Sequence, residues 1–257
     1  MILTDTHTHL YADQFNEDRD EMIQRCFDDN ISRLFLPNID KSSVDGMMDL
    51  VEKYPKNCFP MIGIHPCSVN ENWKEELYEY KELLKTTKFY AVGEIGIDLY
   101  WDKTTQSIQE EAFEAQILMA KELKMPIVIH ARDSFDEIFA IVDKHNNDDL
   151  TGIFHCFTGT IEQANKIINY GGFKLGIGGV VTFKNAGVDK VVKEIPLEHL
   201  VLETDSPYLA PHPYRGKRNE SPYLKLIAEK IKNGEAIVIS ENGKLKVIQG
   251  EELKNLE

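Results

Sequence analysis

The sequence shows one pattern eight times, a short apolar run followed by a longer amphipathic stretch. The apolar runs, interpreted as strands, are residues 1–5, 33–36, 59–64, 89–95, 126–129, 152–154, 173–177 and 200–203. The stretches with helical spacing of apolar residues are 15–28, 43–54, 73–84, 107–123, 135–144, 161–170, 188–194 and 221–232. Strands that alternate with helices form a parallel sheet. Eight such units in 257 residues predict an α/β fold, a single (β/α)8 TIM-type barrel.

A doubly wound sheet is the alternative fold for this alternation, but its first turn is normally a glycine-rich phosphate loop. Here His-Thr-His occupies that turn, and the glycines Gly176, Gly178 and Gly179 lie on and just after the seventh run. We interpret these glycines as allowing close approach of the backbone at the barrel rim, including approach to a substrate.

The barrel is expected to span residues 1–233, and residues 234–257 depart from its pattern. Residues 235–240 and 245–249 alternate in strand fashion around Glu241-Asn242-Gly243-Lys244. Asn-Gly between two such runs is a strong hairpin signal. The tail is therefore predicted to be a hairpin-like extension of the same domain.

Composition limits the partners and the compartment. The formal net charge of −14 repels polyanions, so binding to nucleic acid would require a local basic patch or metal ions. The four cysteines are Cys26, Cys58, Cys67 and Cys156. They form no Cys-x-x-Cys motif, which argues against disulfides and thiolate zinc sites and fits a reducing cytosol. No leader pattern and no run of about 18 apolar residues is present, so a cytoplasmic protein without membrane contact or an obligate protein partner is expected.

The motif Asp5-Thr6-His7-Thr8-His9 follows the apolar pair at the start of the chain. Alternate residues of a strand share a face, so His7 and His9 point the same way, with Asp5 on the same parity. Such a group can converge on one divalent cation, although a histidine can also simply pack in the core.

Five further polar residues follow the apolar runs at the predicted carboxyl ends of separate strands, where barrel active sites lie. They are His65, Glu94, His130, His155 and Asp205. Each alone could be a packed histidine or a helix cap, but together they would leave several costly buried charges unless cations were bound. Histidine and carboxylate ligands suit Zn, Mn, Fe, Co or Mg, and Glu94 is the candidate to bridge two ions.

The candidate residues other than His65 lie in five strings, which are Thr-Asp-Thr-His-Thr-His-Leu (4–10), Val-Gly-Glu-Ile-Gly-Ile-Asp (92–98), Pro-Ile-Val-Ile-His-Ala-Arg-Asp (126–133), Phe-His-Cys-Phe-Thr-Gly (154–159) and Leu-Glu-Thr-Asp-Ser-Pro-Tyr-Leu-Ala-Pro (202–211). These strings resemble the TatD family of metal-dependent deoxyribonucleases. The resemblance covers about residues 1–233 and implies an amidohydrolase-type barrel with two divalent metal ions. It implies one ion on His7, His9, Glu94 and Asp205, and the other on Glu94, His130 and His155. It places His65 near the substrate phosphate. Family members usually end in a long helix, so the tail of this chain departs from the family.

The expected activity is metal-dependent hydrolysis of phosphodiester bonds in DNA, single-stranded or at ends, with RNA as a further substrate. The resemblance suggests 3′ to 5′ exonuclease action. A metal-bound hydroxide would attack phosphorus, and Asp205 would orient it and accept its proton. The alternatives are hydrolysis of a small lactone, cyclic amide or phosphoester, and a noncatalytic metal-binding scaffold. Glu94, where such relatives often carry a carboxylated lysine, favours the nuclease.

Candidate substrate contacts lie outside the ligand set. Arg132 follows His130 by two residues and could neutralise a phosphate oxygen or form a salt bridge at a helix start. The loop 213–218 contains Tyr214 and Arg215 together with Lys217 and Arg218. This loop follows Asp205 closely and could contact nucleic acid or only be solvated. No base is apparent for Cys156, which is predicted to be structural.

Overall fold

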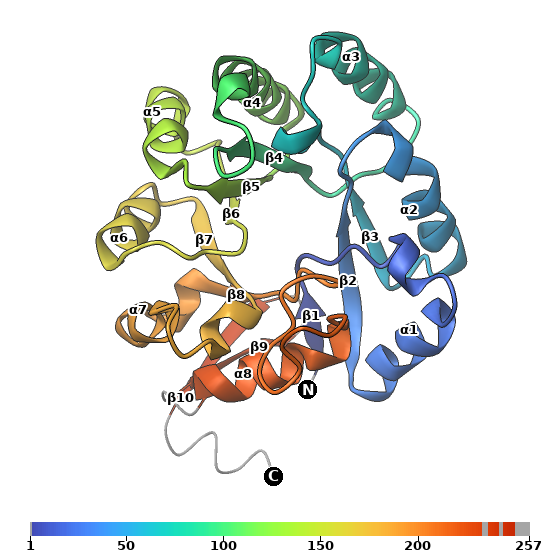
Figure 1. The fold of residues 1–257 in the computed structure, drawn as a ribbon, viewed down its shortest axis with the longest axis vertical. Coiled ribbons are helices and arrows are strands. Elements are labelled where there is room, and N and C mark those ends of the chain that lie inside the picture. Colours follow the sequence, from blue (N-terminus) through green and yellow to red (C-terminus); the bar gives the residue numbers. More distant parts are fainter. Residues whose placement is uncertain (1, 233–235, 242–243, 250–257) are drawn as a thin grey trace. The chain divides into compact units, whose positions relative to one another are not determined.

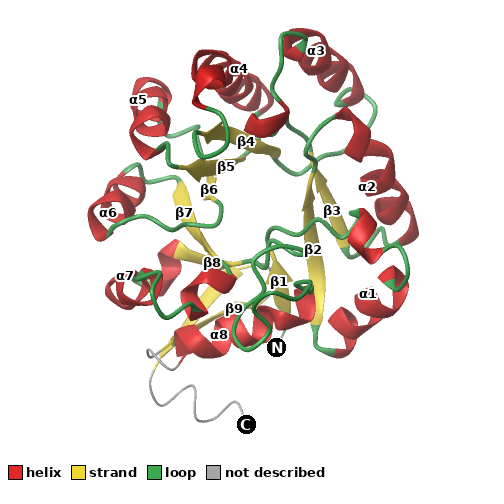
Figure 2. Ribbon diagram, in the orientation of Figure 1, coloured by secondary structure: helices red, strands yellow, loops and turns green. Residues whose placement is uncertain are grey.

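The computed structural model describes residues 2–232, 236–241 and 244–249 (Figure 1). The strands are β1 (Leu3–Asp5), β2 (Ile31–Pro37), β3 (Cys58–Met61), β4 (Val92–Asp98), β5 (Ile127–Arg132), β6 (Gly152–Phe154), β7 (Phe173–Ile177), β8 (Leu200–Leu202), β9 (Ala236–Glu241) and β10 (Lys244–Gln249). The α-helices are α1 (Arg19–Asp28), α2 (Lys41–Lys53), α3 (Trp73–Leu83), α4 (Gln106–Leu123), α5 (Phe135–His145), α6 (Ile161–Asn169), α7 (Val188–Glu194) and α8 (Leu224–Lys232). Short 3₁₀ helices are η1 (Asp13–Phe15), η2 (Pro66–Ser68), η3 (Lys103–Thr105), η4 (Gly179–Thr182), η5 (Leu197–His199) and η6 (Ser221–Tyr223). Strands and helices alternate from β1 to α8, as the sequence predicts (Figure 2).

The chain divides into two compact units, and the strands from β1 to β8 pair in parallel within each. The first unit comprises Met1–Phe35, Cys156–Asn165 and Lys174–Glu257, and the second comprises Leu36–His155 and Lys166–Phe173. In the first unit β1 pairs with β2, and β7 pairs with β8. In the second unit β5 pairs with β4 and with β6. Parallel strands joined through helices are what the alternation in the sequence predicts.

Strand β4 lies about three residues further along the chain than predicted, over Val92–Asp98 instead of 89–95. The apolar run ends at Ile95, but the strand continues through Gly96, whose φ is 143°. A Cβ at Gly96 would lie 2.0 Å from the carbonyl oxygen of His130 on β5, so only glycine allows the two strands to approach here. Glu94 therefore lies inside β4, and its predicted position at the end of the strand is wrong.

Helix α4 is amphipathic, as its periodicity predicts. Its buried face includes Ala112, Phe113 and Ile117, together with the two glutamines Gln109 and Gln116. Burial of two amides on one helix indicates that they hydrogen-bond to neighbouring backbone. Neither α4 nor any other helix in the stretches that the structure describes is both long and apolar enough to cross a membrane.

The tail forms the two strands expected of it. β9 and β10 pair in antiparallel fashion, with Lys244 opposite Glu241, and the predicted Asn242-Gly243 turn lies outside the described residues. Both strands contact η5, and β9 also contacts α8. The domain boundary at residues 233 and 234 stays a prediction.

The glycines near the end of β7 make room for other parts of the same chain. A Cβ at Gly176 would lie 2.3 Å from Oε2 of Glu203, and one at Gly179 would lie 2.1 Å from the carbonyl oxygen of Leu209. At Gly178 the nearest atom would be 3.7 Å away, an ordinary contact. Close approach was predicted correctly for two of the three glycines, but the partners are Glu203 and Leu209, so these contacts give no support to approach by a substrate.

We predict that Gly176→Ala lowers the free energy of unfolding by about 1 to 3 kcal/mol, because the added methyl must displace the buried Glu203 carboxylate. Gly178→Ala is the matched control, two residues away with room for a Cβ, and should change stability by less than about 0.5 kcal/mol. Urea denaturation followed by circular dichroism measures both. Equal midpoints for the two variants would contradict the proposed packing.

Candidate metal centre

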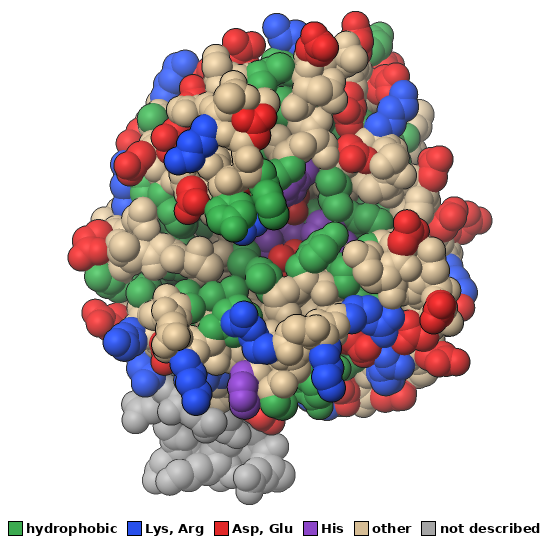
Figure 3. Space-filling model, viewed as in Figure 1, with side chains coloured by type: hydrophobic (Ala, Val, Ile, Leu, Met, Phe, Trp, Pro, Cys, Tyr) green, Lys and Arg blue, Asp and Glu red, His purple; other side chains and the backbone are tan. Residues whose placement is uncertain are grey.

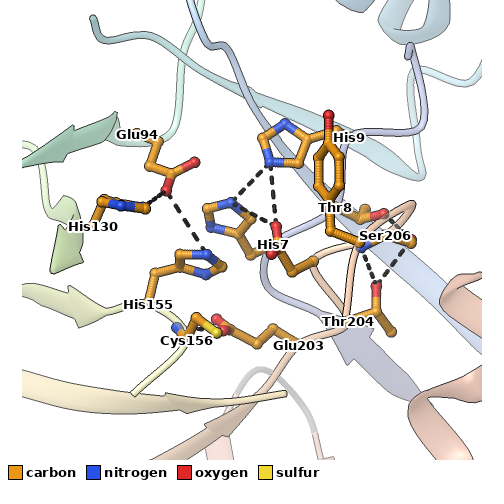
Figure 4. A network of polar contacts seen from close by, with 12 residues as sticks. His7, Thr8, His9, Glu94, His130, His155, Cys156, Glu203, Thr204 and Ser206 are labelled. Carbon is orange, nitrogen blue, oxygen red and sulfur yellow. Dashed lines mark hydrogen bonds and ion pairs between the residues drawn. The ribbon is translucent and has the colours of Figure 1, made fainter. Parts of the chain in front are cut away.

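The first cluster consists of His7, His9 and Asp205 in the first unit, and Figure 4 shows both histidines. His7 Nε2 lies 3.2 Å from His9 Nε2, and Asp205 Oδ1 lies 3.8 Å and 3.4 Å from these two nitrogens. Both imidazoles are buried. The other nitrogen of His9, Nδ1, lies 2.8 Å from the hydroxyl of Tyr11. Two imidazole nitrogens and a carboxylate oxygen thus lie within 3.8 Å of one another.

Backbone hydrogen bonds hold this cluster together. The N–H of Asp205 donates to the carbonyl of His7 at 2.9 Å, and the N–H of His9 donates to the carbonyl of Ser206 at 2.7 Å. The hydroxyls of Thr8 and Ser206 are 2.8 Å apart, in a buried position (Figure 4). These hydrogen bonds join the segment after β1 to the segment after β8. Side chains that are almost 200 residues apart in the sequence therefore lie close together.

Asp5 stabilises the contact between these two segments, and we do not assign it as a metal ligand. Its carboxylate accepts hydrogen bonds from the backbone N–H and the hydroxyl of Thr204, at 2.9 Å and 2.5 Å, and from the N–H of His7 at 3.3 Å. Burial raises the pKa of Asp5 to about 7, although these hydrogen bonds act to lower it. The expectation from strand parity that Asp5 converges on the cation is therefore replaced by a structural role.

The second cluster consists of His65, Glu94, His130 and His155 in the second unit. Glu94 Oε1 lies 2.8 Å from His130 Nδ1, 3.6 Å from His65 Nε2 and 3.8 Å from His155 Nε2. Figure 4 shows His130 and His155 directed at this carboxylate. Ligand atoms of His65, Glu94 and His130 all lie within 4.8 Å of one another. The structure thus brings His65, predicted to contact substrate, into the same group as the predicted ligands.

Asp98 belongs to the second cluster and was missed in the sequence analysis. Its Oδ2 lies 2.9 Å from His130 Nε2, so the imidazole is held between Asp98 and Glu94. Burial opposes ionisation of Asp98, but the hydrogen bond and charge of His130, together with the backbone N–H groups of Tyr100 and Trp101, outweigh it and lower the pKa of Asp98 to about 2. Burial likewise lowers the pKa of His130, yet the two carboxylates raise it to about 9. A carboxylate behind a histidine fixes which ring nitrogen faces a metal, here Nδ1. The sequence did offer a signal for Asp98, because it is the last residue of the string 92–98 that carries the family resemblance.

Amide side chains position the backbone beneath the second cluster. Gln116 Oε1 accepts a hydrogen bond from the N–H of Ile64 at 2.7 Å, just before His65. Gln109 of the same helix, α4, accepts from the N–H of Asp98 at 2.8 Å and donates to its carbonyl at 3.2 Å. These hydrogen bonds account for the two glutamines on the buried face of α4. They hold the backbone in place at Asp98 and at Ile64, the residue before His65.

Glu203 is a second acidic residue that the sequence analysis left unassigned. It is fully buried, and its Oε1 accepts a hydrogen bond from the N–H of Cys156 at 2.5 Å. Glu203 lies two residues before Asp205, so the rule that alternate residues of a strand share a face would have indicated it as a candidate. The contact with Glu203 uses the backbone of Cys156, in keeping with the structural role predicted for that residue.

The residues predicted to bind substrate contact aromatic rings. The Arg132 guanidinium carbon lies 3.8 Å from the ring centre of Tyr100, and that of Arg215 lies 3.6 Å from the ring centre of Phe183. Tyr214 stacks on Tyr223 with ring centres 4.3 Å apart. Their roles toward substrate stay predictions.

Arg218 is engaged within the protein. Its guanidinium donates to both carboxylate oxygens of Asp18, at 2.6 Å and 2.7 Å, and to Glu220 at 2.7 Å. Because two carboxylates neutralise it, Arg218 is a poor candidate for a phosphate contact, and the basic character of loop 213–218 comes from Arg215 and Lys217.

The donor atoms of both clusters suit divalent cations. In each cluster imidazole nitrogens meet carboxylate oxygens, without a thiolate, the ligand set used by Zn, Mn, Fe and Co. Crowding of buried nitrogen and oxygen lone pairs is unfavourable unless a proton or a metal ion lies between them. The raised pKa of His130 reflects the same preference for positive charge beside Glu94.

Comparison with known proteins decides the family. The family model described as TatD related DNase matches residues 4–243. The chain belongs to the TatD family.

Relatives within the TatD family match almost the whole chain. An uncharacterized metal-dependent hydrolase of Bacillus subtilis, YabD, is 42% identical over 231 residues, which are 90% of each chain. A protein of Citrobacter rodentium named 3′-5′ ssDNA/RNA exonuclease TatD is 32% identical over 234 residues, 88% of each chain. The crystal structure of the TatD homologue YjjV of Escherichia coli superposes with a TM-score of 0.84 at 25% identity, covering 90% of each chain. These matches confirm the predicted fold class, an α/β chain of the TIM-barrel type, and identify a TatD-family metal-dependent hydrolase.

We predict that Asp98→Asn weakens Zn²⁺ binding about 10- to 100-fold, because it removes the carboxylate that orients His130 and raises its basicity. Competition with a chromophoric chelator measures the affinity. Asp133→Asn is the matched control, since Asp133 is an exposed carboxylate at φ 55°, a conformation that asparagine adopts as readily. Unchanged Zn²⁺ affinity in Asp98→Asn would show that Asp98 does not support the ligand.

Proposed function

We propose that the chain hydrolyses phosphodiester bonds in single-stranded DNA from the 3′ end, with RNA as a second substrate and two divalent metal ions as cofactors. The name of the Citrobacter relative and the description of the family model support this substrate class. The ligand chemistry of the two clusters supports the need for metal.

We also propose that the two clusters form one centre. One ion would be held by His7, His9, Glu94 and Asp205, and the other by Glu94, His130 and His155. The observation that carries this proposal is the position of the Glu94 carboxylate, whose Oε1 lies within 3.8 Å of three histidine nitrogens. The carboxyl ends of the strands of a TIM-type barrel meet at one rim, which would bring His7, His9 and Asp205 to the same place. Bound there, two divalent ions would supply Lewis acidity, lowering the pKa of water and neutralising charge on the phosphate.

We assign the general base to Asp205. Its side chain is 14% exposed, whereas His7 and His9 are almost fully buried, which supports access of water to the carboxylate. The hydrogen bond from its N–H to His7 holds the backbone in position. In the proposed reaction the carboxylate orients the attacking water and accepts its proton, while the bond from phosphorus to the leaving 3′ oxygen breaks. The proton then passes to that oxygen, which leaves as a 3′ hydroxyl and restores the carboxylate.

We assign to His65 a hydrogen bond to the substrate phosphate. Its Nδ1 accepts a hydrogen bond from the N–H of Cys67 at 3.1 Å, so the ring proton lies on Nε2, on the side of Glu94. Burial opposes protonation of His65, but the nearby Glu94 raises its pKa above the ordinary value. An N–H donor in this position can stabilise charge on a nonbridging phosphate oxygen.

The acidic protein also needs cations that attract a polyanion. Figure 3 shows acidic and basic side chains interspersed on the visible face, so the net charge of −14 is not spread as a uniform negative surface. Arg215 and Lys217 are exposed, whereas Arg218 is held by Asp18 and Glu220. We assign the backbone contacts to Arg215 and Lys217, with Tyr214 as an aromatic neighbour.

The proposal is tested with single-stranded oligonucleotides labelled at either end, in Mg²⁺, Mn²⁺ or Zn²⁺. A 3′ label should be released at once as a mononucleotide, and a 5′ label should yield a ladder of shortening products. A chelator should stop both reactions. Asp205→Asn should lower kcat about 100- to 10,000-fold, the usual contribution of a general base. Glu111→Gln, an exposed carboxylate on α4, is the control and should retain full activity.

Intact oligonucleotides in the presence of metal-loaded protein would contradict the proposal. Hydrolysis of a lactone, a cyclic amide or a phosphotriester at a higher kcat/KM than DNA would replace it with a small-molecule hydrolase. Metal binding without turnover of any of these substrates would favour the noncatalytic scaffold.

A further inference from the structure

Two exposed aromatic side chains follow β4 directly. Tyr100 is 54% exposed and Trp101 is 71% exposed, and their rings meet edge to face with centres 4.9 Å apart. The guanidinium of Arg132, at the end of β5, lies 3.8 Å from the centre of the Tyr100 ring and 5.4 Å from that of Trp101. Large apolar rings left in water next to a stacked arginine are typical of a surface that binds a ligand.

This group is attached to the second cluster through Asp98. One oxygen of Asp98, Oδ1, accepts hydrogen bonds from the N–H groups of Tyr100 at 3.0 Å and Trp101 at 3.4 Å. The other oxygen, Oδ2, lies 2.9 Å from His130 Nε2. One buried carboxylate thus fixes both the aromatic turn and a predicted metal ligand.

Arg132 is fixed in the same way. It pairs with Asp98 in the register of β4 and β5, its carbonyl accepts from the N–H of Leu99 at 2.9 Å, and its N–H donates to the hydroxyl of Ser134 at 3.1 Å. Arg132 lies two positions after His130, so its backbone is about 7 Å further along β5. The side chain of Arg132 therefore starts from an ordered strand next to the second cluster.

We propose that Tyr100, Trp101 and Arg132 form a platform on which an unpaired nucleobase stacks while the neighbouring phosphate lies at the second cluster. This inference rests on the proposed function and adds a binding subsite to it. Aromatic faces and arginine planes stack with every base and read no sequence. Bases in a duplex have their faces covered by neighbouring pairs, so such a platform favours single strands.

The platform is tested by kinetics on an oligothymidylate and on an abasic oligonucleotide of equal length and charge. Trp101→Ala and Tyr100→Ala should each lower kcat/KM for oligothymidylate roughly 5- to 150-fold, as expected for loss of one stacked base. Both variants should match the wild type on the abasic strand, and Trp101→Phe should recover most of the loss. Tyr78→Ala removes an aromatic ring of similar exposure from α3 and should leave kcat/KM unchanged for both substrates.

A binding measurement decides the platform separately from catalysis. The two tryptophans are Trp73, which is 6% exposed, and Trp101, so Trp73→Phe leaves the emission of Trp101 alone. Oligothymidylate should quench that emission, and the abasic strand should not. Equal quenching by both strands, no quenching, or unchanged kcat/KM in Trp101→Ala would overturn the platform. Quenching by oligothymidylate that is never cleaved would support the platform and contradict the proposed nuclease.

Discussion

The buried carboxylate of Glu94 is the constraint on which the second unit depends. It is 2% exposed and lies within 3.8 Å of nitrogens from three histidines. A buried negative charge is costly unless positive charge or hydrogen-bond donors surround it. The neighbouring residues meet this need, because Gly96 lets β4 approach His130 and Asp98 turns the imidazole of His130 toward Glu94.

In the first unit, backbone hydrogen bonds hold the segments that carry the buried histidines and Asp205. The segments after β1 and β8 are joined through His7, His9 and the residues near Asp205, and the carboxylate of Asp5 ties Thr204 to the same place. These hydrogen bonds fix the backbone that carries the two imidazoles, whose Nε2 atoms lie 3.2 Å apart. Preorganisation of this kind lowers the cost of binding a cation, because the protein does not have to rearrange.

The parts of the site that follow local rules were predictable from the sequence. The β-then-α order gave parallel strands with polar residues near their carboxyl ends. His7 and His9 lie together as predicted, but the strand rule used for them does not apply, because β1 ends at Asp5 and both histidines follow it. Residues that act through long-range contacts were not predictable. Asp98 and Glu203 depend on partners at His130 and Cys156, more than 30 residues away in the chain, and periodicity carries no information about such pairs.

The same limit explains two changes of interpretation. Gly176 was expected at a place of close approach, but only the structure shows that the Glu203 carboxylate fills the space. Arg218 looked like a free cation because the sequence does not reveal that Asp18, 200 residues away, neutralises it. A sequence shows which residues are charged and which are glycines. Which groups contact those residues depends on tertiary packing.

We propose above that both clusters serve one pair of metal ions bridged by Glu94. Anomalous diffraction at the zinc edge from Zn²⁺-loaded crystals tests this proposal most directly. Two peaks that share the Glu94 carboxylate are expected, one also bonded to His7 and His9 and the other to His130 and His155. A single peak, or two peaks that do not both contact Glu94, would contradict it.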